Sequence, residues 1–386
     1  MTNARYPLRW LLPGLIATLA CASTQTSPDP QTSWISAPAL YEVFTRDFSP
    51  EGSFAGVIAG LDRIQASGAD VISLMPIHPD YGTEADLRRL VEEVHRRGMR
   101  IIIDWTDVAD LNYRDPGQRA AMIADMKYWL DRYNLDGFRV DAPGLAPDDF
   151  WREALPALRA NRRPILLLAK WADPKLHALG FDLSYGSDGY GKLKAVWQGE
   201  PAASFVDERE VEEQLPNNGR RLRFTTNHDE TVRDQLPPVV FGGAAGARAA
   251  FVAMAFMPGV PMLYNGQEVE SPQKLGLYVK GSVQSEHQPG DEARAFYRRV
   301  LDLATSHPAF TGGELQPVIT DAPRDVISYA RGDVLVLVNT RPREIAVNVH
   351  GKLLDGSRDL IYGNTHHGST VRLGAYGTAV LDPMSR

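Results

Sequence analysis

Several short hydrophobic segments of this sequence end in charged side chains whose types suit chemistry on a sugar. In chain order these side chains are Asp104, Arg139, Asp141, Lys170, His228 and Asp229. Carboxylates grouped with Arg and His stabilise a cationic, oxocarbenium-like transition state. A single Asp at a strand end is more often the cap of the following helix than a nucleophile. These residues therefore indicate a catalytic function only when they are taken together.

The elements that must position this set are eight predicted strands with helical segments between them. The strand segments read ALYEVFTRDF, DVISLMPI, RIIIDW, DGFRVDA, PILLLAKW, FDLSYG, RLRFTTNHD and VPMLYNGQE. Helical spacing is clear in one connecting segment, at Leu87, Leu90, Val91 and Val94. The pattern predicts an α/β fold, a (β/α)8 TIM barrel over residues 37–306, with its site at the C-terminal ends of the strands. A doubly wound sheet is the alternative.

From about His307 the pattern changes to valine-rich strands. The segments DVISYARGDVLVLVNTRPREIAVNVHG and TVRLGAYGTAVLD alternate in polarity and contain Gly, Arg-Pro and Asp-Gly turn signals with no helix between them. Residues 307–386 are therefore predicted to form a separate small antiparallel β-sandwich domain.

The N-terminus has the features of an export signal. Arg5 and Arg9 precede an apolar stretch, Trp10 to Ala20, that is shorter than the roughly 20 residues needed to cross a bilayer. Residues 1–21 are therefore predicted to be a secretory signal, followed by a polar, flexible tether at 22–36.

The only cysteine, Cys21, ends this apolar stretch in the sequence TLAC, which resembles a bacterial lipoprotein processing site. The resemblance implies lipidation of Cys21 and a membrane-anchored lipoprotein of the bacterial cell envelope. The alternative is ordinary cleavage after Ala22, which would leave the protein periplasmic or extracellular. A single cysteine excludes an intramolecular disulfide.

Composition excludes several other classes of function. The 386 residues are 44% hydrophobic and 23% charged, as in an ordinary globular protein. The net charge of −7 and the lack of a long basic run argue against a nucleic-acid partner. No cofactor is predicted.

Two of the strand segments, DGFRVDA and FTTNHDE in that order, resemble signature segments of the alpha-amylase family of glycoside hydrolases. The similarity extends from LYEVFTRDFSPEGSFAGVI through GVPMLYNGQE into the terminal β-domain. It implies that Asp141 holds the position of the nucleophile and that Arg139 keeps this Asp ionised. It also implies that His228 and Asp229, the latter at the position of the transition-state stabiliser, grip sugar hydroxyls. The implied ligand is an α-linked oligosaccharide or glucan.

Lys170 departs from that family, because the resemblance places the general acid/base Glu at its position. Retaining hydrolysis needs a second carboxyl group about 5 to 5.5 Å from the nucleophile. A lysine side chain, whose ordinary pKa is about 10.4, can hardly serve as a base at neutral pH. We therefore expect Lys170 to neutralise Asp141 and Asp229. Hydrolysis would be lost or strongly impaired, which leaves carbohydrate binding or an envelope scaffold role.

Two loops also depart from the family. Val108 and Ala109 stand where the family has an Asn-His pair that supports calcium and contacts the sugar, and neither side chain can do so. No metal site is therefore predicted. The loop after the second strand is short and lacks the family's sugar-stacking tyrosine, for which Tyr81 is a weak substitute. Asp104 and Trp171 complete the predicted substrate contacts.

For the remaining candidates a structural role competes with a functional one. Trp105 and Trp171 could form a sugar-stacking platform, although core packing is the default. A structural hydrogen-bonding role is favoured for Glu268. A turn is favoured for the pair at 366–367, His-His, over a metal site.

Two other functions stay open from the sequence. One is an active retaining α-glycosidase or transglycosidase that uses Asp141 as nucleophile and another acid, such as Asp173 or Asp107. The other is a protein-interaction scaffold that does not bind sugar. Turnover assays would distinguish the active enzyme from a protein without hydrolysis. Glucan-binding assays would distinguish the interaction scaffold from a protein that binds sugar.

Overall fold

The computed structural model describes residues 33–105, 111–160, 163–207, 214–276, 281, 283, 291–350 and 354–383. The predictions for the signal, for Cys21, and for Asp107, Val108 and Ala109 lie outside the described residues. Over the described ranges, the helices are all too short or too polar to cross a membrane.

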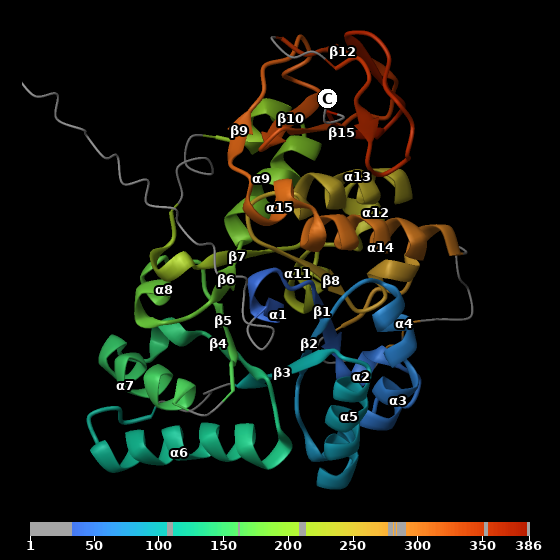
Figure 1. Ribbon diagram of the computed structural model, residues 1–386. Coiled ribbons are helices and arrows are strands. Elements are labelled where there is room, and N and C mark those ends of the chain that lie inside the picture. The colour runs from blue at the N-terminus through green and yellow to red at the C-terminus, as the bar shows by residue number, and fades with distance from the viewer. Residues whose placement is uncertain are drawn as a thin grey trace, which may run out of the picture.

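Eight parallel strands form a closed barrel, with each strand paired to the next and the first paired to the last (Figure 1). The strands are β1 (Leu40–Phe44), β2 (Val71–Met75), β3 (Arg100–Trp105), β4 (Gly137–Asp141), β5 (Leu166–Lys170), β6 (Leu183–Tyr185), β7 (Arg220–Arg223) and β8 (Val260–Tyr264). Each lies on its predicted segment, with β7 starting one residue earlier, so the TIM barrel is confirmed. The doubly wound alternative is wrong, because the pairing of β1 with β8 leaves no sheet edge.

Helices follow the strands and pack outside the barrel. The α-helices are α1 (Ser33–Ser36), α2 (Thr45–Phe48), α3 (Phe54–Ala59), α4 (Leu61–Ala66), α5 (Glu84–Arg96), α6 (Pro116–Tyr133), α7 (Asp148–Arg159), α8 (Lys175–Leu179), α9 (Ser187–Trp197), α11 (His228–Arg233), α12 (Pro237–Val240), α13 (Ala244–Ala255), α14 (Asp291–Ser306) and α15 (Pro308–Gly312). Short 3-10 helices are η1 (Pro79–Tyr81), η2 (Pro143–Leu145), η3 (Ala202–Phe205), η4 (Pro216–Asn218) and η5 (Gln267–Val269).

The sequence explains both the start and the buried face of α5. Thr83 and Asp86 form a capping box that satisfies backbone N–H groups at the start of the helix. The predicted apolar positions are all buried against the barrel: Leu87, Leu90, Val91 and Val94. The helical spacing read from the sequence is therefore confirmed.

Helix α6 does not lie alongside α5 as neighbouring helices of a barrel usually do. It runs crosswise to α5 (Figure 1), and the two meet near the C-terminal end of α6, where Arg132 forms an ion pair with Glu84 at 3.2 Å. Its N-terminal half packs toward α7 instead, through an ion pair of Arg119 with Asp149 at 2.6 Å.

The C-terminal domain consists of two antiparallel sheets, as predicted. Its strands are β9 (Leu315–Pro317), β10 (Val326–Arg331), β11 (Val334–Asn339), β12 (Ile345–Asn348), β13 (Arg358–Asp359), β14 (Thr370–Leu373) and β15 (Thr378–Asp382). The larger sheet has the order β13-β15-β11-β10-β9, and β12 pairs with β14 in the smaller one.

This domain is less separate from the barrel than the sequence pattern predicts. Every residue of β10 and β11 is buried, because their sheet is covered on both faces. On one face Tyr329 and Val336 belong to the core that continues into the barrel, and the Tyr329 hydroxyl donates to the carbonyl of Ala253 in α13 at 2.9 Å. On the other face Leu335 and Leu337 belong to the core shared with the smaller sheet.

One buried cation joins the two domains. The guanidinium of Arg331 donates to the backbone carbonyls of Gly313, Phe256 and Phe310 at 3.0, 2.7 and 2.9 Å. These carbonyls lie at or just beyond the ends of α13 and α15, where helices leave acceptors without partners. Burial lowers the pKa of Arg331 to about 10, so the side chain remains charged at neutral pH.

Asp70, directly before β2, has a carboxyl group whose effect on the stability of the protein can be tested by changing the pH. Its carboxylate accepts the Ala39 N–H at 2.7 Å, and burial raises its pKa from 3.8 to about 6. A raised carboxyl pKa means that ionisation costs stability, and the cost grows as pH rises through about 4 to 6. We expect Asp70→Asn to stabilise the protein by about 1–3 kcal/mol at pH 8, with a smaller gain toward pH 4.

Urea denaturation of wild type and Asp70→Asn at both pH values measures this difference. Asp125→Asn, at an exposed position of α6, is the matched control and should change little at either pH. A gain for Asp70→Asn that is equal at pH 4 and pH 8 would contradict the assignment of a raised pKa.

Candidate active site

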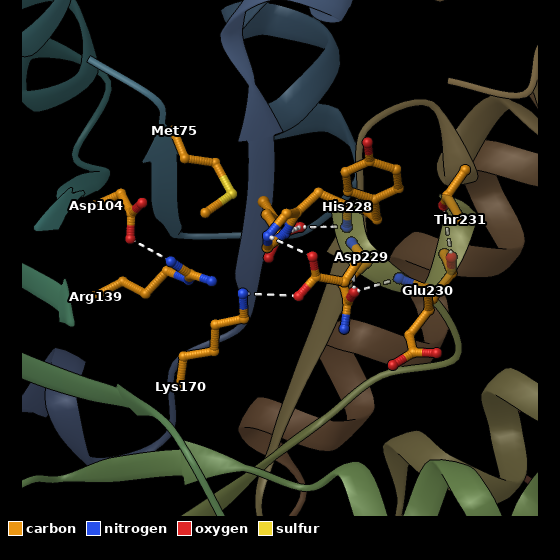
Figure 2. A network of polar contacts seen from close by, with 12 residues as sticks. Met75, Asp104, Arg139, Lys170, His228, Asp229, Glu230 and Thr231 are labelled. Atoms are coloured by element: carbon orange, nitrogen blue, oxygen red, sulfur yellow. Dashed lines mark hydrogen bonds and ion pairs between the residues drawn. The ribbon is translucent and has the colours of Figure 1, made fainter. Parts of the chain in front are cut away.

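The register of the parallel strands brings the predicted residues of β3, β4 and β5 together. Asp104 is the partner of Arg139, and Asp141 is the partner of Lys170. Alternate residues of a strand face the same side, so Arg139 and Asp141 share a face. Arg139 donates from Nη1 to Asp104 Oδ1 (Figure 2), and its Nη1 lies 4.0 Å from Asp141 Oδ2.

The backbone turns sharply directly after Asp141. Ala142 has φ 44° and ψ 49°, a left-handed conformation that costs a residue with a Cβ atom about 1–2 kcal/mol. Such conformations gather at functional sites, where the surrounding structure holds them. Here the turn leads directly into η2 and leaves Asp141 as the last residue of β4.

Lys170 points into this cluster. Its Nζ atom lies 2.7 Å from Asp229 Oδ2 and 3.3 Å from Asp141 Oδ1, and Figure 2 shows its side chain directed toward Asp229. The predicted ion pairs of Lys170 with both aspartates are therefore present. The single ammonium group lies between two carboxylates from different strand ends.

Asn227 caps the helix that follows β7. Its side-chain Oδ1 accepts the N–H groups of Asp229 and Glu230 at 2.9 Å each, which makes it the N-cap of α11. Asn is among the residues preferred at this position. The order Asn-His-Asp thus starts a helix at the barrel mouth and places His228 and Asp229 in its first turn.

The sequence analysis missed two residues of the cluster, Glu42 and Tyr185. Glu42 is fully buried in β1, and its Oε1 accepts the backbone N–H of His228 and contacts His228 Nδ1, both at 2.9 Å. The Tyr185 hydroxyl of β6 donates to Glu42 Oε2 at 3.1 Å and accepts from Arg139 Nε at 3.0 Å. A signal was available for Glu42, because a charge inside the apolar segment ALYEVF requires buried partners.

The charges of the site are mutually compensated. Burial acts to raise the pKa of Asp229, but His228 and the hydrogen bond from Lys170 hold it below its ordinary value. Burial likewise opposes ionisation of Glu42, and His228 and Arg139 outweigh it, so its pKa is also lowered. Both groups are carboxylates at neutral pH.

The other predicted substrate contacts lie apart from the ammonium. Tyr81 lies in η1, and its ring packs edge-on against Phe54 with centroids 6.3 Å apart. Trp171 directly follows Lys170, is 43% exposed and lies over Gly144. Trp105 is half-buried at the end of β3 and lines a cleft together with Asp104.

The alternative acid Asp173 lies two residues before the start of α8. Its Oδ1 accepts the Lys175 N–H at 2.9 Å, and its Oδ2 lies 3.8 Å from Lys175 Nζ. Glu230, beside Asp229, has a pKa raised by burial, and its carboxylate lies 3.7 Å from Arg233.

The structural roles favoured by the sequence agree with the contacts. Glu268 is fully buried, accepts the Tyr41 hydroxyl at 2.8 Å and pairs with Arg63 at 3.2 Å. His366 contacts the carbonyl of Gly368 at 3.1 Å within a turn. In the part of the chain that the structure describes, His, Cys, Asp and Glu side chains form no group of three or more that could hold a metal ion.

Comparison with known proteins gives one family model and many relatives. The model described as D-apionate lactonase, C-terminal immunoglobulin-like domain, matches residues 323–381. Alpha-amylase MalA of Haloarcula japonica is 26% identical over 302 residues, which cover 61% of this chain. The chain spans 44% of the length of that protein.

Solved structures resemble the chain over most of its length. The crystal structure of an alpha-amylase from Lactobacillus plantarum has a TM-score of 0.77 at 22% identity, covering 90% of this chain and 99% of the other. The crystal structure of AmyP in complex with maltose has a TM-score of 0.73 at 15% identity, covering 91% of this chain and 97% of the other. These structures have the same fold as this chain.

Proposed function

Starting from the finding that this chain is a homologue of the alpha-amylase family of glycoside hydrolases, we propose that it binds α-linked gluco-oligosaccharides and that ordinary hydrolysis is lost or strongly impaired. The observation that carries this proposal is the ammonium of Lys170 between Asp141 and Asp229. The proposal takes this to be the position from which a retaining glycosidase would supply its acid/base carboxyl group, as the sequence resemblance implies.

The geometry gives a physical reason for impaired catalysis. A sugar carbon that is attacked must lie about 3–3.5 Å from the nucleophile. One oxygen of Asp141 already has the Lys170 ammonium at 3.3 Å, and the other lies 4.0 Å from Arg139. A cation beside the reacting carbon also opposes the positive charge of an oxocarbenium-like transition state.

The order of the site supports binding, because the resemblance implies that His228 contacts sugar hydroxyls and that Arg139 keeps Asp141 ionised. His228 is held by Glu42, and Arg139 is held by Asp104 and Tyr185, so both keep a fixed geometry. A neighbour of the same fold was crystallised with maltose. The described cluster therefore supports recognition of an α-glucan more than it supports turnover.

Isothermal titration calorimetry with maltotriose tests the proposal, and cellotriose, which has β-linkages, is the control sugar. We expect saturable binding of maltotriose and at least about tenfold weaker binding of cellotriose. Absence of saturable binding of either sugar would refute the proposal and favour the protein-interaction scaffold.

We also propose that Cys21 is lipidated and anchors the exported protein to the membrane of the cell envelope. The support is the position of Cys21 after an apolar stretch and before a polar tether. Several acyl chains on one residue give stable anchoring, whereas a single chain binds reversibly. We expect wild type in the membrane fraction and Cys21→Ser in the soluble fraction. Equal soluble amounts of the two proteins would refute lipidation.

A further inference from the structure

A cleft of about 730 Å³ lies beside the candidate site, between α5, α6, the end of β3 and the segment after β2. It lies near the ion pair of Arg132 with Glu84, where α6 runs crosswise to α5 (Figure 1). Its volume is within the range of about 300–1,000 Å³ that is typical of small-molecule sites. Apart from Asp104, the residues of the candidate site do not line this cleft.

Aromatic side chains from three elements line the cleft. Trp105 ends β3, Tyr128 and Trp129 lie on α6, and Phe54 lies on α3. Tyr128 is 51% exposed, and Trp129 is half-buried, stacked on Tyr133 with ring centroids 4.9 Å apart. Aromatic rings with accessible faces suit ligands that have both an apolar face and polar edges.

The charged groups of the cleft favour a neutral ligand. Glu84 is paired with Arg132 at 3.2 Å, and Asp104 is paired with Arg139. Both carboxylates keep acceptor capacity for hydroxyl groups, because an ionised carboxylate has several lone pairs. Since each negative charge already has a cation beside it, the cleft offers little net charge to select an ionic ligand.

Asp104 links the cleft to the candidate site, because it lines the cleft and also receives the hydrogen bond from Arg139. The centre of the candidate site is occupied by the Lys170 ammonium and its two carboxylates. A sugar held in the cleft reaches Asp104 without displacing that ammonium.

We infer that this cleft binds a short α-linked gluco-oligosaccharide, with sugar faces against Trp129 and Tyr128 and hydroxyls on Asp104 and Glu84. This inference rests on the proposed function, namely that the protein binds α-glucan, and it adds where the glucan binds. In this inference the sugar rings are held by residues of α5, α6 and β3, next to the strand ends that carry Arg139, Lys170 and His228.

Titration of maltotriose, followed by calorimetry and by tryptophan fluorescence, tests the location. Tyr128→Ala removes an exposed ring, and Trp129→Phe keeps the stacking on Tyr133 while reducing the surface offered to the sugar. We expect each to weaken binding by about tenfold or more. Tyr362→Ala, which removes an equally exposed ring from the C-terminal domain, should leave binding unchanged. Lys170→Met should change the affinity less than about threefold.

The outcomes separate this inference from the proposed function. Suppose that maltotriose binding is unchanged in Tyr128→Ala and Trp129→Phe but is lost in Trp171→Ala or Lys170→Met. The inference that the cleft is the binding site would then be wrong, and the proposal that the protein binds glucan would remain. No binding of maltotriose to wild type would overturn both. A crystal soaked with maltotriose provides the independent check: density against Trp129 supports the inference, and density confined to Asp141 and Asp229 overturns it.

Discussion

Wild-type protein should show no turnover of malto-oligosaccharides or of an activated aryl α-glucoside. General acid–base catalysis contributes about 10²- to 10⁴-fold to the rate of such reactions. At the proposed position of the acid/base group this chain has the Lys170 ammonium. The same ammonium neutralises Asp141 and Asp229 at 3.3 and 2.7 Å, so the nucleophile position is also affected. We therefore expect one side chain to impair both chemical steps of a retaining mechanism.

Lys170→Glu should restore at most a trace of activity. The substitution places a carboxyl group on β5, but it leaves unchanged Ala109 and the short loop after β2, where the family resemblance implies that sugar contacts are missing. It also places three carboxyl groups together, so that one must hold a proton. Since the three side chains are 15–29% exposed, we expect a loss of about 2–3 kcal/mol, less than for a fully buried pair.

Lys175→Glu is the matched control for this stability loss. Lys175 also contacts two aspartates, Asp148 at 3.4 Å and Asp173 at 3.8 Å, but its side chain is 49% exposed. Ion pairs of this kind contribute about 0–1 kcal/mol, so the control should unfold close to wild type. Thermal melts of the three proteins measure the difference.

Hydrolysis by wild type that disappears in Asp141→Asn would contradict the proposed loss of activity and establish a working enzyme. In that event Glu230→Gln identifies the acid, because burial raises the pKa of Glu230 toward the range of a proton donor. Asp173→Asn tests the alternative acid that the sequence suggested, whose side chain accepts the Lys175 N–H.

Arg331→Met should destabilise the whole protein by about 3 kcal/mol. Removal of the guanidinium leaves two buried carbonyls and one half-buried carbonyl without this donor, at about 1–3 kcal/mol for each buried one. Part of this loss is offset because the buried cation no longer has to be desolvated, a cost reflected in its lowered pKa of about 10. Urea denaturation followed by circular dichroism measures the net effect.

Arg372→Met is the control for the loss of an arginine from the same domain. Its side chain is 75% exposed and pairs with Glu344 at 3.4 Å, so a change of less than about 1 kcal/mol is expected. If Arg331→Met behaved like Arg372→Met, the carbonyl acceptors would be satisfied in another way, and Arg331 would not join the domains.

The barrel was predictable from the sequence because each strand is a short apolar segment with a helix after it. Closure was also predictable, since eight such units match the number that a small barrel needs. The burial of the C-terminal sheet on both faces was not predicted from strand alternation. Its signal was present in β11, where Val334 to Val338 are apolar without a break, which is typical of strands covered on both faces.

Contacts that depend on local order in the sequence could be predicted, and contacts between distant strands could not. The pairing of Lys170 with Asp141 follows from strand order and register. The hydrogen bond from Tyr185 to Glu42 joins β6 to β1 across the barrel, and no spacing in the sequence predicts it. The cleft depends on the crossing angle of α6, which packing of the whole helix layer determines.

The position of β15 in its sheet also determines when the molecule can finish folding. This strand, at Thr378–Asp382, pairs with β11 on one side and with β13 on the other, although it is the last strand of the described chain. Until those residues have been synthesised, β11 has an open edge on the side that β15 covers in the folded protein. An unpaired apolar strand is a template for aggregation. A chain that lacks Thr378–Asp382 would therefore keep that edge of β11 open permanently.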